Sequence, residues 1–268
     1  MTLQTLQTRV VSGMNVSFFN EQEFNQIYDD IFKYDEWRFV ANTSTPLILD
    51  CGAHIGMSVL YFKKLYPRAK IIAFEANPQT FKLLELNVRQ NNLSDVKLVN
   101  AAVANTTEAM DFYIFEETSD STLWTWGNAG VKNSWYDPKT YKTIQVPTIK
   151  LSSYINEKVD FVKIDIEGME EQVLRELEGK LVYIEQLAME FHGSSTNLSN
   201  SAERIISLLR KNKYKYGVTQ GKKVIKIERA DKTDPYFLML YASKKRSILW
   251  WHIYVLQNMN RIYRRAGV

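Results

Sequence analysis

Two acidic residues, each at the end of an apolar stretch, have the spacing of a nucleoside-binding site. Asp50 precedes Gly52 and Gly56 in an Asp-x-Gly-x-x-x-Gly turn, and Glu75 follows Gly52 by 23 residues. A carboxylate about 20 residues beyond a glycine turn can accept hydrogen bonds from both hydroxyls of a ribose. The turn lacks the third glycine of a dinucleotide site, and Asp50 repels a pyrophosphate but suits an ammonium group. The two signals together favour an adenosine-type ligand with a cationic end, a description that S-adenosylmethionine fits.

Each signal also has an ordinary structural explanation. Glycine turns connect strands to helices in many α/β proteins, and a carboxylate at a strand end can simply be solvated. Asn100 and Ala101, which follow the next apolar stretch, would place an amide and a small side chain near an adenine. This third signal is the weakest.

Four further polar residues end two later apolar stretches and could act on a substrate. Asp165 and Glu167 follow the first stretch, and Glu190 and His192 follow the second. Ligands of open α/β sheets bind beyond the carboxyl ends of the strands, and histidine is the side chain best matched to proton abstraction near neutral pH. We expect His192 to deprotonate a substrate hydroxyl, with Asp165 or Glu190 orienting its imidazole or binding the hydroxyl. The alternative is a structural histidine.

The same carboxylates raise the question of a metal ion. Asp165 and Glu167 could hold magnesium, because paired oxygens suit that ion. Two carboxylates without an evident third ligand are thin evidence, so the sequence favours no metal site. Glu170 is expected to be a favourable acid in the first turn of a helix.

Strands and helices must alternate along the chain to position these residues. Apolar stretches predict strands at 47–49, 71–74, 96–99, 159–164 and 183–191, and helical patterns occupy 59–65, 78–92, 169–177 and 202–211. Strands that are apolar throughout are typical of parallel strands buried on both faces. The pattern therefore predicts an α/β protein with a mostly parallel sheet.

Three segments interrupt or flank this alternation. Residues 1–45 are rich in aromatic side chains, with a helix expected at 20–33, and residues 109–149 are expected to form an insertion or lid of two strands around a loop. Near the C-terminus, Lys223–Glu228 and Tyr236–Ala242 are expected to pair as a hairpin. Aromatic residues of the insertion could stack on sugar rings or pack as ordinary core: Trp124, Trp126, Trp135, Tyr136 and Tyr141.

The C-terminal residues 244–268 form a basic tail. They carry six basic and no acidic residues, so residues 1–243 have a net charge of −2 in a chain whose total is +4. Apolar residues recur at helical spacing from Ile248 to Ile262. Basic groups beside a Trp-containing apolar face suit a helix at an anionic membrane surface. The same face suits packing on the body of the protein or on a second subunit in a homodimer.

The composition is that of a globular protein, with 45% hydrophobic and 24% charged residues. The single cysteine, Cys51, excludes an internal disulfide, and no Cys/His cluster indicates zinc. The nearly neutral body argues against a nucleic-acid partner, which needs a broad basic surface. The sequence shows no signal-peptide pattern and no apolar run of about 18 residues. We therefore expect a cytoplasmic protein, at most peripherally attached to a membrane.

Five segments, in this order, resemble the FkbM family of S-adenosylmethionine-dependent methyltransferases: LILDCGAHIGMSVLYFKKLYP, KIIAFEANPQTFKLLELNV, VNAAVA, VDFVKIDIEGMEEQVL and MEFHG. The resemblance covers about residues 36–195, and KIDIEG is its most specific part. It implies the class I methyltransferase fold for residues 46–243. In this Rossmann-like α/β fold, a seven-stranded, mostly parallel sheet has an antiparallel last strand and helices on both faces. The resemblance also implies O-methylation of a sugar, glycan or natural product, which could be lipid-linked.

The resemblance also assigns roles to residues. By it, Asp50, Gly52, Glu75 and Asn100 bind the cofactor, and Asp165, Glu167 and His192 face the reaction. The full expected cofactor site adds His54, Gly56, Ser58, Asn77, Ala101 and Asp165, and the catalytic set adds Glu190. His54 stands where we expect an asparagine, and Ala76-Asn77-Pro78 replaces the usual Pro-x-Pro. Both departures leave the ribose-binding acid intact.

Two other classes of function stay open. A nicotinamide-dependent oxidoreductase also has a strand, a glycine turn and an acid, but the third glycine is missing here. A non-catalytic interaction protein could keep the fold and use the basic tail, but it would need neither Asp165 nor His192.

Overall fold

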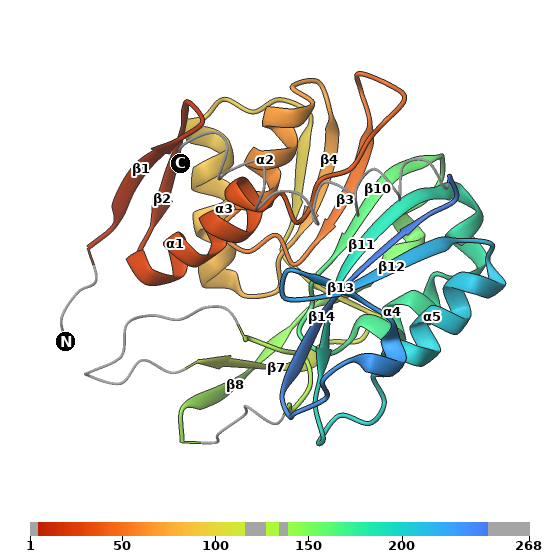
Figure 1. Cartoon of the computed structure of the whole chain (residues 1–268). Coiled ribbons are helices and arrows are strands. Elements are labelled where there is room, and N and C mark those ends of the chain that lie inside the picture. The colour runs from red at the N-terminus through yellow and green to blue at the C-terminus, as the bar shows by residue number, and fades with distance from the viewer. Residues whose placement is uncertain (1–4, 116–126, 134–138, 246–268) are drawn as a thin grey trace.

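A mixed sheet of eight strands forms the centre of the chain in the computed structural model, which describes residues 5–115, 127–133 and 139–245 (Figure 1). Its strands are β3 (Leu47–Cys51), β4 (Lys70–Phe74), β5 (Val96–Val99), β10 (Val159–Ile164), β11 (Ile184–Gly193), β12 (Lys215–Gln220), β13 (Lys223–Ile225) and β14 (Tyr236–Ser243). Their order across the sheet is β13-β12-β14-β11-β10-β3-β4-β5. The strands β11, β10, β3, β4 and β5 run parallel, and β14 is antiparallel to both of its neighbours.

This topology confirms the predicted fold class, a mostly parallel sheet with an antiparallel last strand. The sheet has eight strands rather than seven because the short β13 pairs with β12 at its edge. The predicted pairing of Lys223–Glu228 with Tyr236–Ala242 is wrong, because β14 lies between β11 and β12 instead. The apolar run of β14 is buried from Leu238 onward, as an interior strand requires.

Helices cover both faces of the sheet, as predicted. The helices α2 (Met57–Leu65) and α3 (Pro78–Gln90) pack on one face, and α4 (Glu170–Glu176) and α5 (Ala202–Lys211) pack on the other. Each face of the sheet has its own hydrophobic core. Of two neighbouring residues in β10, Phe161 belongs to the first core, beneath α2 and α3, and Val162 to the second, beneath α4 and α5. All six residues of β10 are buried, as expected for a strand covered on both faces. Short 3-10 turns lie at Leu151–Tyr154, Glu178–Tyr183 and Ile227–Arg229.

The N-terminal segment packs into the first of these cores. It comprises a hairpin of β1 (Gln7–Val11) and β2 (Met14–Phe18), then α1 (Glu21–Tyr28) and a π-helical turn at Asp29–Lys33. The sequence predicts the helix but not the hairpin. The backbone N–H of Ser17 donates to Asn87 Oδ1 at 2.7 Å, and Asn87 Nδ2 donates to the Ser17 carbonyl at 3.0 Å. These bonds hold the hairpin against α3.

The insertion and the residues that flank it form two small sheets beside the main one. In these, β7 (Met110–Phe115) pairs with β8 (Tyr141–Val146), and β6 (Ala102–Ala104) pairs with β9 (Thr148–Lys150). The aromatic residues Trp124, Trp126, Trp135 and Tyr136 lie outside the described residues, as does the basic tail from residue 246 onward. Among the helices that the structure describes, none has the length and apolar character needed to cross a membrane.

Candidate active site

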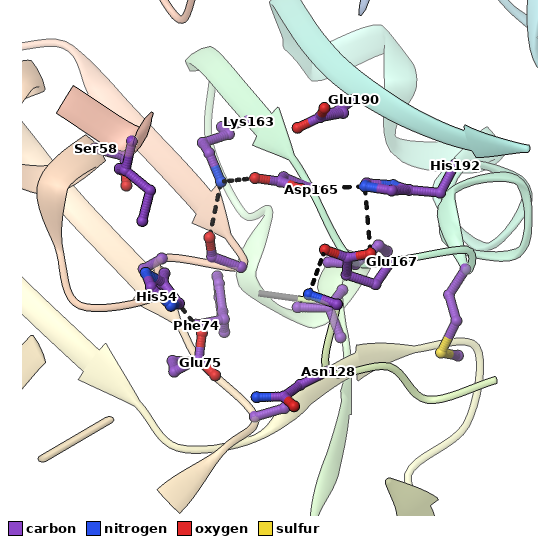
Figure 2. A pocket seen from close by; sticks show the side chains of 18 of the residues that line it. His54, Ser58, Phe74, Glu75, Asn128, Lys163, Asp165, Glu167, Glu190 and His192 are labelled. Carbon is purple, nitrogen blue, oxygen red and sulfur yellow. Dashed lines mark hydrogen bonds and ion pairs between the residues drawn. The ribbon is translucent and has the colours of Figure 1, made fainter. Parts of the chain in front are cut away.

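A cavity of about 530 Å³ lies at the carboxyl ends of the central strands, where the order of the chain reverses between β3 and β10. Ligands of open α/β sheets bind at such a switch point, and the volume is typical of a small-molecule site. The N-terminal segment, the insertion and β14 complete the walls. The predicted site residues that line the cavity are Gly52, His54, Ser58, Glu75, Ala101, Asp165, Glu167, Glu190 and His192 (Figure 2).

Glu75 follows β4 and presents a buried carboxylate to one end of the cavity. Its Oε2 accepts a hydrogen bond from the backbone N–H of His54 at 2.9 Å, and its Oε1 accepts one from that of Asn77 at 2.8 Å. Burial raises the pKa of this carboxyl, although His54 and the two hydrogen bonds oppose the rise. The carboxylate is held in one position while each oxygen keeps a lone pair for a ligand hydroxyl.

Two residues that were predicted to bind the cofactor, Asn77 and Asn100, instead stabilise the turn around Glu75. Asn77 is the N-cap of α3, where its side chain accepts a backbone N–H of the first turn at 2.9 Å. Asn100 Nδ2 donates to the carbonyl of Glu75 at 2.8 Å. Ala101 and Phe74 do line the cavity, and they give this end an apolar wall that suits a planar base.

The two glycines of the first turn are required because the chain packs closely on itself. Gly52 has a φ of +79°, and a Cβ atom there would lie 1.8 Å from the carbonyl oxygen of Asp165. Gly56 has a φ of +92°, and its Cβ would lie 2.7 Å from Leu84 Cδ1 on α3. The loops after β3 and β10 therefore meet at Gly52, and this contact brings Asp165 to the turn.

Asp50 is fully buried beneath the cavity and contacts two of the residues that line it. Ser58 Oγ donates to its Oδ2 at 2.6 Å, and Lys163 Nζ lies 3.4 Å from its Oδ1. Lys163 also donates to the Gly52 carbonyl at 2.8 Å and pairs with Asp165 at 3.2 Å. Burial works against the charged ammonium, but Asp165 and Asp50 outweigh it and raise the pKa of Lys163. The sequence does not predict this lysine as a site residue; its signal is a charge inside an apolar strand.

His192, near the end of β11, is held between carboxylates on both sides of its ring. Its Nδ1 lies 2.8 Å from Glu170 Oε1, and its Nε2 lies 3.4 Å from Glu167 Oε2 and 4.0 Å from Asp165 Oδ1. Burial works against the charged imidazole, but Glu167 and Glu170 outweigh it and raise the pKa of His192 well above its usual range. The residue that orients the ring is therefore Glu170, and not Asp165 or Glu190 as expected.

Glu170 is itself held through both carboxylate oxygens. The backbone N–H of Gly168 donates to its Oε1 at 2.8 Å, and Asn200 Nδ2 donates to its Oε2 at 2.5 Å and to the His192 carbonyl at 3.1 Å. A carboxylate at Nδ1 keeps a proton on that nitrogen and fixes the ring so that Nε2 points toward the cavity. The sequence marks Glu170 only as an acid at the start of a helix, and no motif marks Asn200.

The wall formed by the N-terminal segment adds further carboxylates. Asp30 lies in the π-helical turn and Glu36 shortly after it. Burial and the charge of Asp30 raise the pKa of Glu36 to about 9, and burial and the charge of Asp165 raise the pKa of Glu190 to about 8. Neither the Glu36 nor the Glu190 side chain has a hydrogen bond or an ion pair with the described residues. Asp165, Glu190 and His192 also lie close enough together to hold a metal ion.

The chain is similar to known methyltransferases. The family model for the methyltransferase FkbM domain matches residues 50–216. Methyltransferase sdnD of Sordaria araneosa is 30% identical over an alignment that covers 56% of this chain and 67% of that protein. Methyltransferase 1 of Beauveria bassiana is 31% identical over 49% of this chain and 58% of that protein.

Two solved structures are also similar to the chain at low sequence identity. Methyltransferase FkbM from Methylobacillus flagellatus KT is 17% identical with a TM-score of 0.48, and the alignment covers 76% of this chain and 44% of that one. M. jannaschii TYW2 in complex with AdoMet is 16% identical with a TM-score of 0.47, covering 90% of this chain and 87% of that one. The chain thus spans less than two thirds of the Beauveria protein and less than half of the Methylobacillus protein.

Proposed function

Because the chain belongs to the FkbM methyltransferase family, we propose that it transfers a methyl group from S-adenosylmethionine to a hydroxyl oxygen of a sugar, glycan or natural product. The observation that carries this proposal is a single cavity with Glu75 at one end and His192, held by Glu170, at the other (Figure 2). Methyl transfer needs donor and acceptor in one space, so that the reacting atoms are held at attack distance.

The residues at the β4 end of the cavity fit S-adenosylmethionine. Glu75 would accept hydrogen bonds from its ribose hydroxyls, and Ala101 and Phe74 would line its adenine. Asp165 follows β10, which lies between β4 and β11 in the sheet, and would bind the ammonium group from the middle of the cavity. When bound, the cofactor supplies a methyl group on a positively charged sulfur that an oxygen nucleophile can displace. Lys163 pairs with Asp165 at 3.2 Å and keeps that carboxylate at the turn.

His192 and the carboxylates around it would act on the acceptor. A hydroxyl is a weak nucleophile whose pKa lies far above neutrality, so its proton must leave as the oxygen attacks. The Nε2 atom of His192 faces the cavity with Glu170 behind the ring, while Glu167, Asp165 and Glu190 surround the same space. We assign activation of the hydroxyl to the neutral form of His192, which its raised pKa makes prevalent only at alkaline pH, and positioning of the hydroxyl to the three carboxylates.

Aromatic side chains near the cluster support a ring-bearing acceptor such as a sugar. Tyr141 of β8 and Phe237 of β14 both line the cavity, and the Phe237 ring lies 5.5 Å from the imidazole of His192. Phe237 is 46% exposed, so an acceptor ring can cover it. Burial of that face would add hydrophobic stabilisation to the complex.

Titration calorimetry on the full chain tests the cofactor assignment. S-adenosylmethionine and S-adenosylhomocysteine should bind, and NAD should not. Incubation with S-adenosylmethionine and a panel of hydroxylated sugars and natural products, followed by mass spectrometry, should then reveal a product heavier by one methylene group. Binding of NAD in place of S-adenosylmethionine would overturn the proposal in favour of an oxidoreductase.

A further inference from the structure

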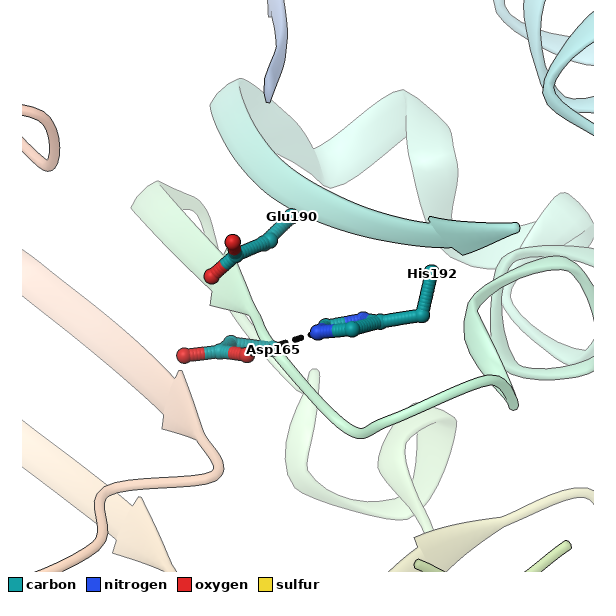
Figure 3. A group of neighbouring side chains, drawn as sticks. All are labelled: Asp165, Glu190 and His192. Carbon is teal, nitrogen blue, oxygen red and sulfur yellow. Dashed lines mark ion pairs between the residues drawn. The ribbon is translucent and has the colours of Figure 1, made fainter. Parts of the chain in front are cut away.

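Three side chains at the acceptor end of the cavity converge on one point. Asp165, Glu190 and His192 each offer a ligand atom, and these atoms all lie within 4.8 Å of one another (Figure 3). We propose that they bind a divalent transition-metal ion, and that this ion holds the oxygen of the methyl acceptor. The ion site itself does not depend on the proposed function, whereas the role given to the ion rests on it.

The spacing of the three ligand atoms suits one ion after small side-chain rotations. Carboxylate oxygens and imidazole nitrogens bind zinc at about 2.0–2.2 Å in a tetrahedron, so two ligand atoms of one ion lie about 3.4 Å apart. The three ligand atoms here lie within 4.8 Å of one another, so each must move by about 1 Å to reach that distance. All three residues lie at or just after the ends of β10 and β11, and the parallel pairing of these strands fixes the spacing of their backbones.

His192 is oriented as metal-binding histidines usually are. In such sites the ring nitrogen that faces away from the metal donates its proton to a carboxylate or carbonyl, which fixes the tautomer and the ring direction. Here Nδ1 lies 2.8 Å from Oε1 of the fully buried Glu170, which Asn200 holds in turn. Nε2 points toward the carboxylates of the cavity, with Glu167 Oε2 at 3.4 Å and Asp165 Oδ1 at 4.0 Å.

The cluster carries more negative charge than the side chains around it neutralise. Lys163 pairs with Asp165 Oδ2 at 3.2 Å, on the side away from His192 (Figure 2). The same ammonium also pairs with Asp50. The Glu190 carboxylate has no hydrogen bond or ion pair with the residues that the structure describes. Two neighbouring carboxylates repel each other, and the repulsion is relieved either by a proton on one of them or by a bound cation. A divalent ion supplies that charge.

The ligand set favours a transition metal over magnesium. Magnesium prefers oxygen ligands in a near-ideal octahedron, whereas imidazole suits zinc and iron, and carboxylates suit manganese. An ion with three protein ligands keeps an open position for the acceptor oxygen and lowers the pKa of its hydroxyl. The proton then has an acceptor in Glu167, whose Oε2 lies 3.4 Å from His192 Nε2. In this proposal His192 is a metal ligand, and the ion takes over the activation of the hydroxyl.

Calorimetric titration of the EDTA-dialysed full chain with MnCl₂, ZnCl₂ and MgCl₂ tests the site. We expect one Mn²⁺ or Zn²⁺ ion per chain, bound at least about tenfold more tightly than Mg²⁺. Glu190→Gln keeps the size of the side chain and should weaken Mn²⁺ binding by about tenfold or more, as should Asp165→Asn. Glu85→Gln removes an exposed carboxylate on α3, away from the cavity, and this control should bind Mn²⁺ as the wild type does. Circular dichroism checks that each variant is folded.

Two results would overturn the metal site: no saturable binding of Mn²⁺ or Zn²⁺, or equal Mn²⁺ binding by the wild type and Glu190→Gln. Titration with S-adenosylmethionine in the same metal-free buffer separates this outcome from the proposed function. Cofactor binding without metal binding overturns the ion site, leaves methyl transfer standing and returns His192 to the role of base. Metal binding by a chain that binds no S-adenosylmethionine supports the ion site and overturns the methyltransferase proposal.

Discussion

Glu170 acts on His192 both through its 2.8 Å contact with Nδ1 and through its charge. The charge stabilises the protonated imidazole, which is why Glu167 and Glu170 together raise the pKa of His192. Glu170→Gln keeps the size of the side chain but removes the charge, so the pKa of His192 should fall toward its ordinary value. NMR titration of the His192 ring resonances in metal-free protein measures this. Glu178→Gln, at a partly exposed carboxylate just beyond the same helix, should leave the pKa of His192 unchanged. An unchanged pKa of His192 in Glu170→Gln would contradict the pairing.

Under the proposed function, His192 acts on the methyl acceptor, so its removal should lower turnover without weakening cofactor binding. We expect His192→Ala to lower turnover on the order of 10²-fold or more, while the affinity for S-adenosylmethionine stays within a few-fold. Initial rates and calorimetry on one preparation measure both quantities. Turnover at the wild-type level would transfer the activating role to Asp165 or Glu190.

Glu75 should show the opposite behaviour. Its two oxygens each accept one backbone hydrogen bond and keep a lone pair toward the cavity. Glu75→Ala should therefore weaken S-adenosylmethionine binding by about tenfold or more, which corresponds to about 1.4 kcal/mol. Glu85→Ala, at an exposed position on α3, is the control. If calorimetry finds the same affinity in both variants, Glu75 does not bind the ribose.

At the scale of elements, the contact between the loops after β3 and β10 depends on one glycine. A Cβ at Gly52 would lie 1.8 Å from the Asp165 carbonyl oxygen, and neither backbone can retreat without breaking the parallel ladder. Gly52→Ala should cost roughly 3 kcal/mol or more of unfolding free energy, or prevent folding. Gly13→Ala has a nearly equal φ of +83° with nothing within 4 Å of the new Cβ, and should cost only about 1–2 kcal/mol. Urea unfolding of the two variants compares them; equal losses would assign the whole effect to φ.

The central elements were predictable from the sequence because parallel strands buried on both faces are apolar throughout. The first strand of the N-terminal hairpin, Gln7–Val11, gives no such signal. Three of its five residues are exposed, and it pairs only with the strand that follows it. The position of β14 in the sheet could not be predicted, because an apolar strand carries no local signal of which strands it pairs with. Contacts with distant parts of the chain decide this. The pairing expected with the segment at Lys223–Glu228 failed for this reason.

Some residues of the candidate site could likewise be predicted from the sequence, and others could not. Glu75, Asp165 and His192 could be identified because each ends a strand, and strand ends meet at one edge of a parallel sheet. Glu170 and Asn200 could not, because their roles depend on contacts across 22 and 30 residues of chain that no local pattern records.

At the scale of the whole molecule, Glu36 links the stability of the fold to pH. Folding raises its pKa from 4.5 to about 9, mainly through burial. A carboxyl whose pKa rises on folding contributes most stability below its unfolded pKa, and that contribution is lost as the pH rises through the folded value. The glutamine in Glu36→Gln cannot ionise. The Tm of this variant should therefore be higher than that of the wild type near pH 9 and equal to it near pH 4.5. Each kcal/mol corresponds to roughly 2–4 °C in Tm. Scanning calorimetry across this range measures the gap, and a gap that does not change with pH would contradict the burial of Glu36.

The N-terminal π-helical turn gives the cavity a wall that comes from outside the family match. Glu75, Asp165 and His192 lie within residues 50–216, whereas Asp30 and Glu36 precede them in the chain. Under the proposed function, the matched part holds the methyl donor and activates the oxygen, while the preceding segment faces the molecule that receives the methyl group. Selection can therefore exchange or remodel that segment and retarget the enzyme to a new acceptor, with the reacting groups at the strand ends left in place.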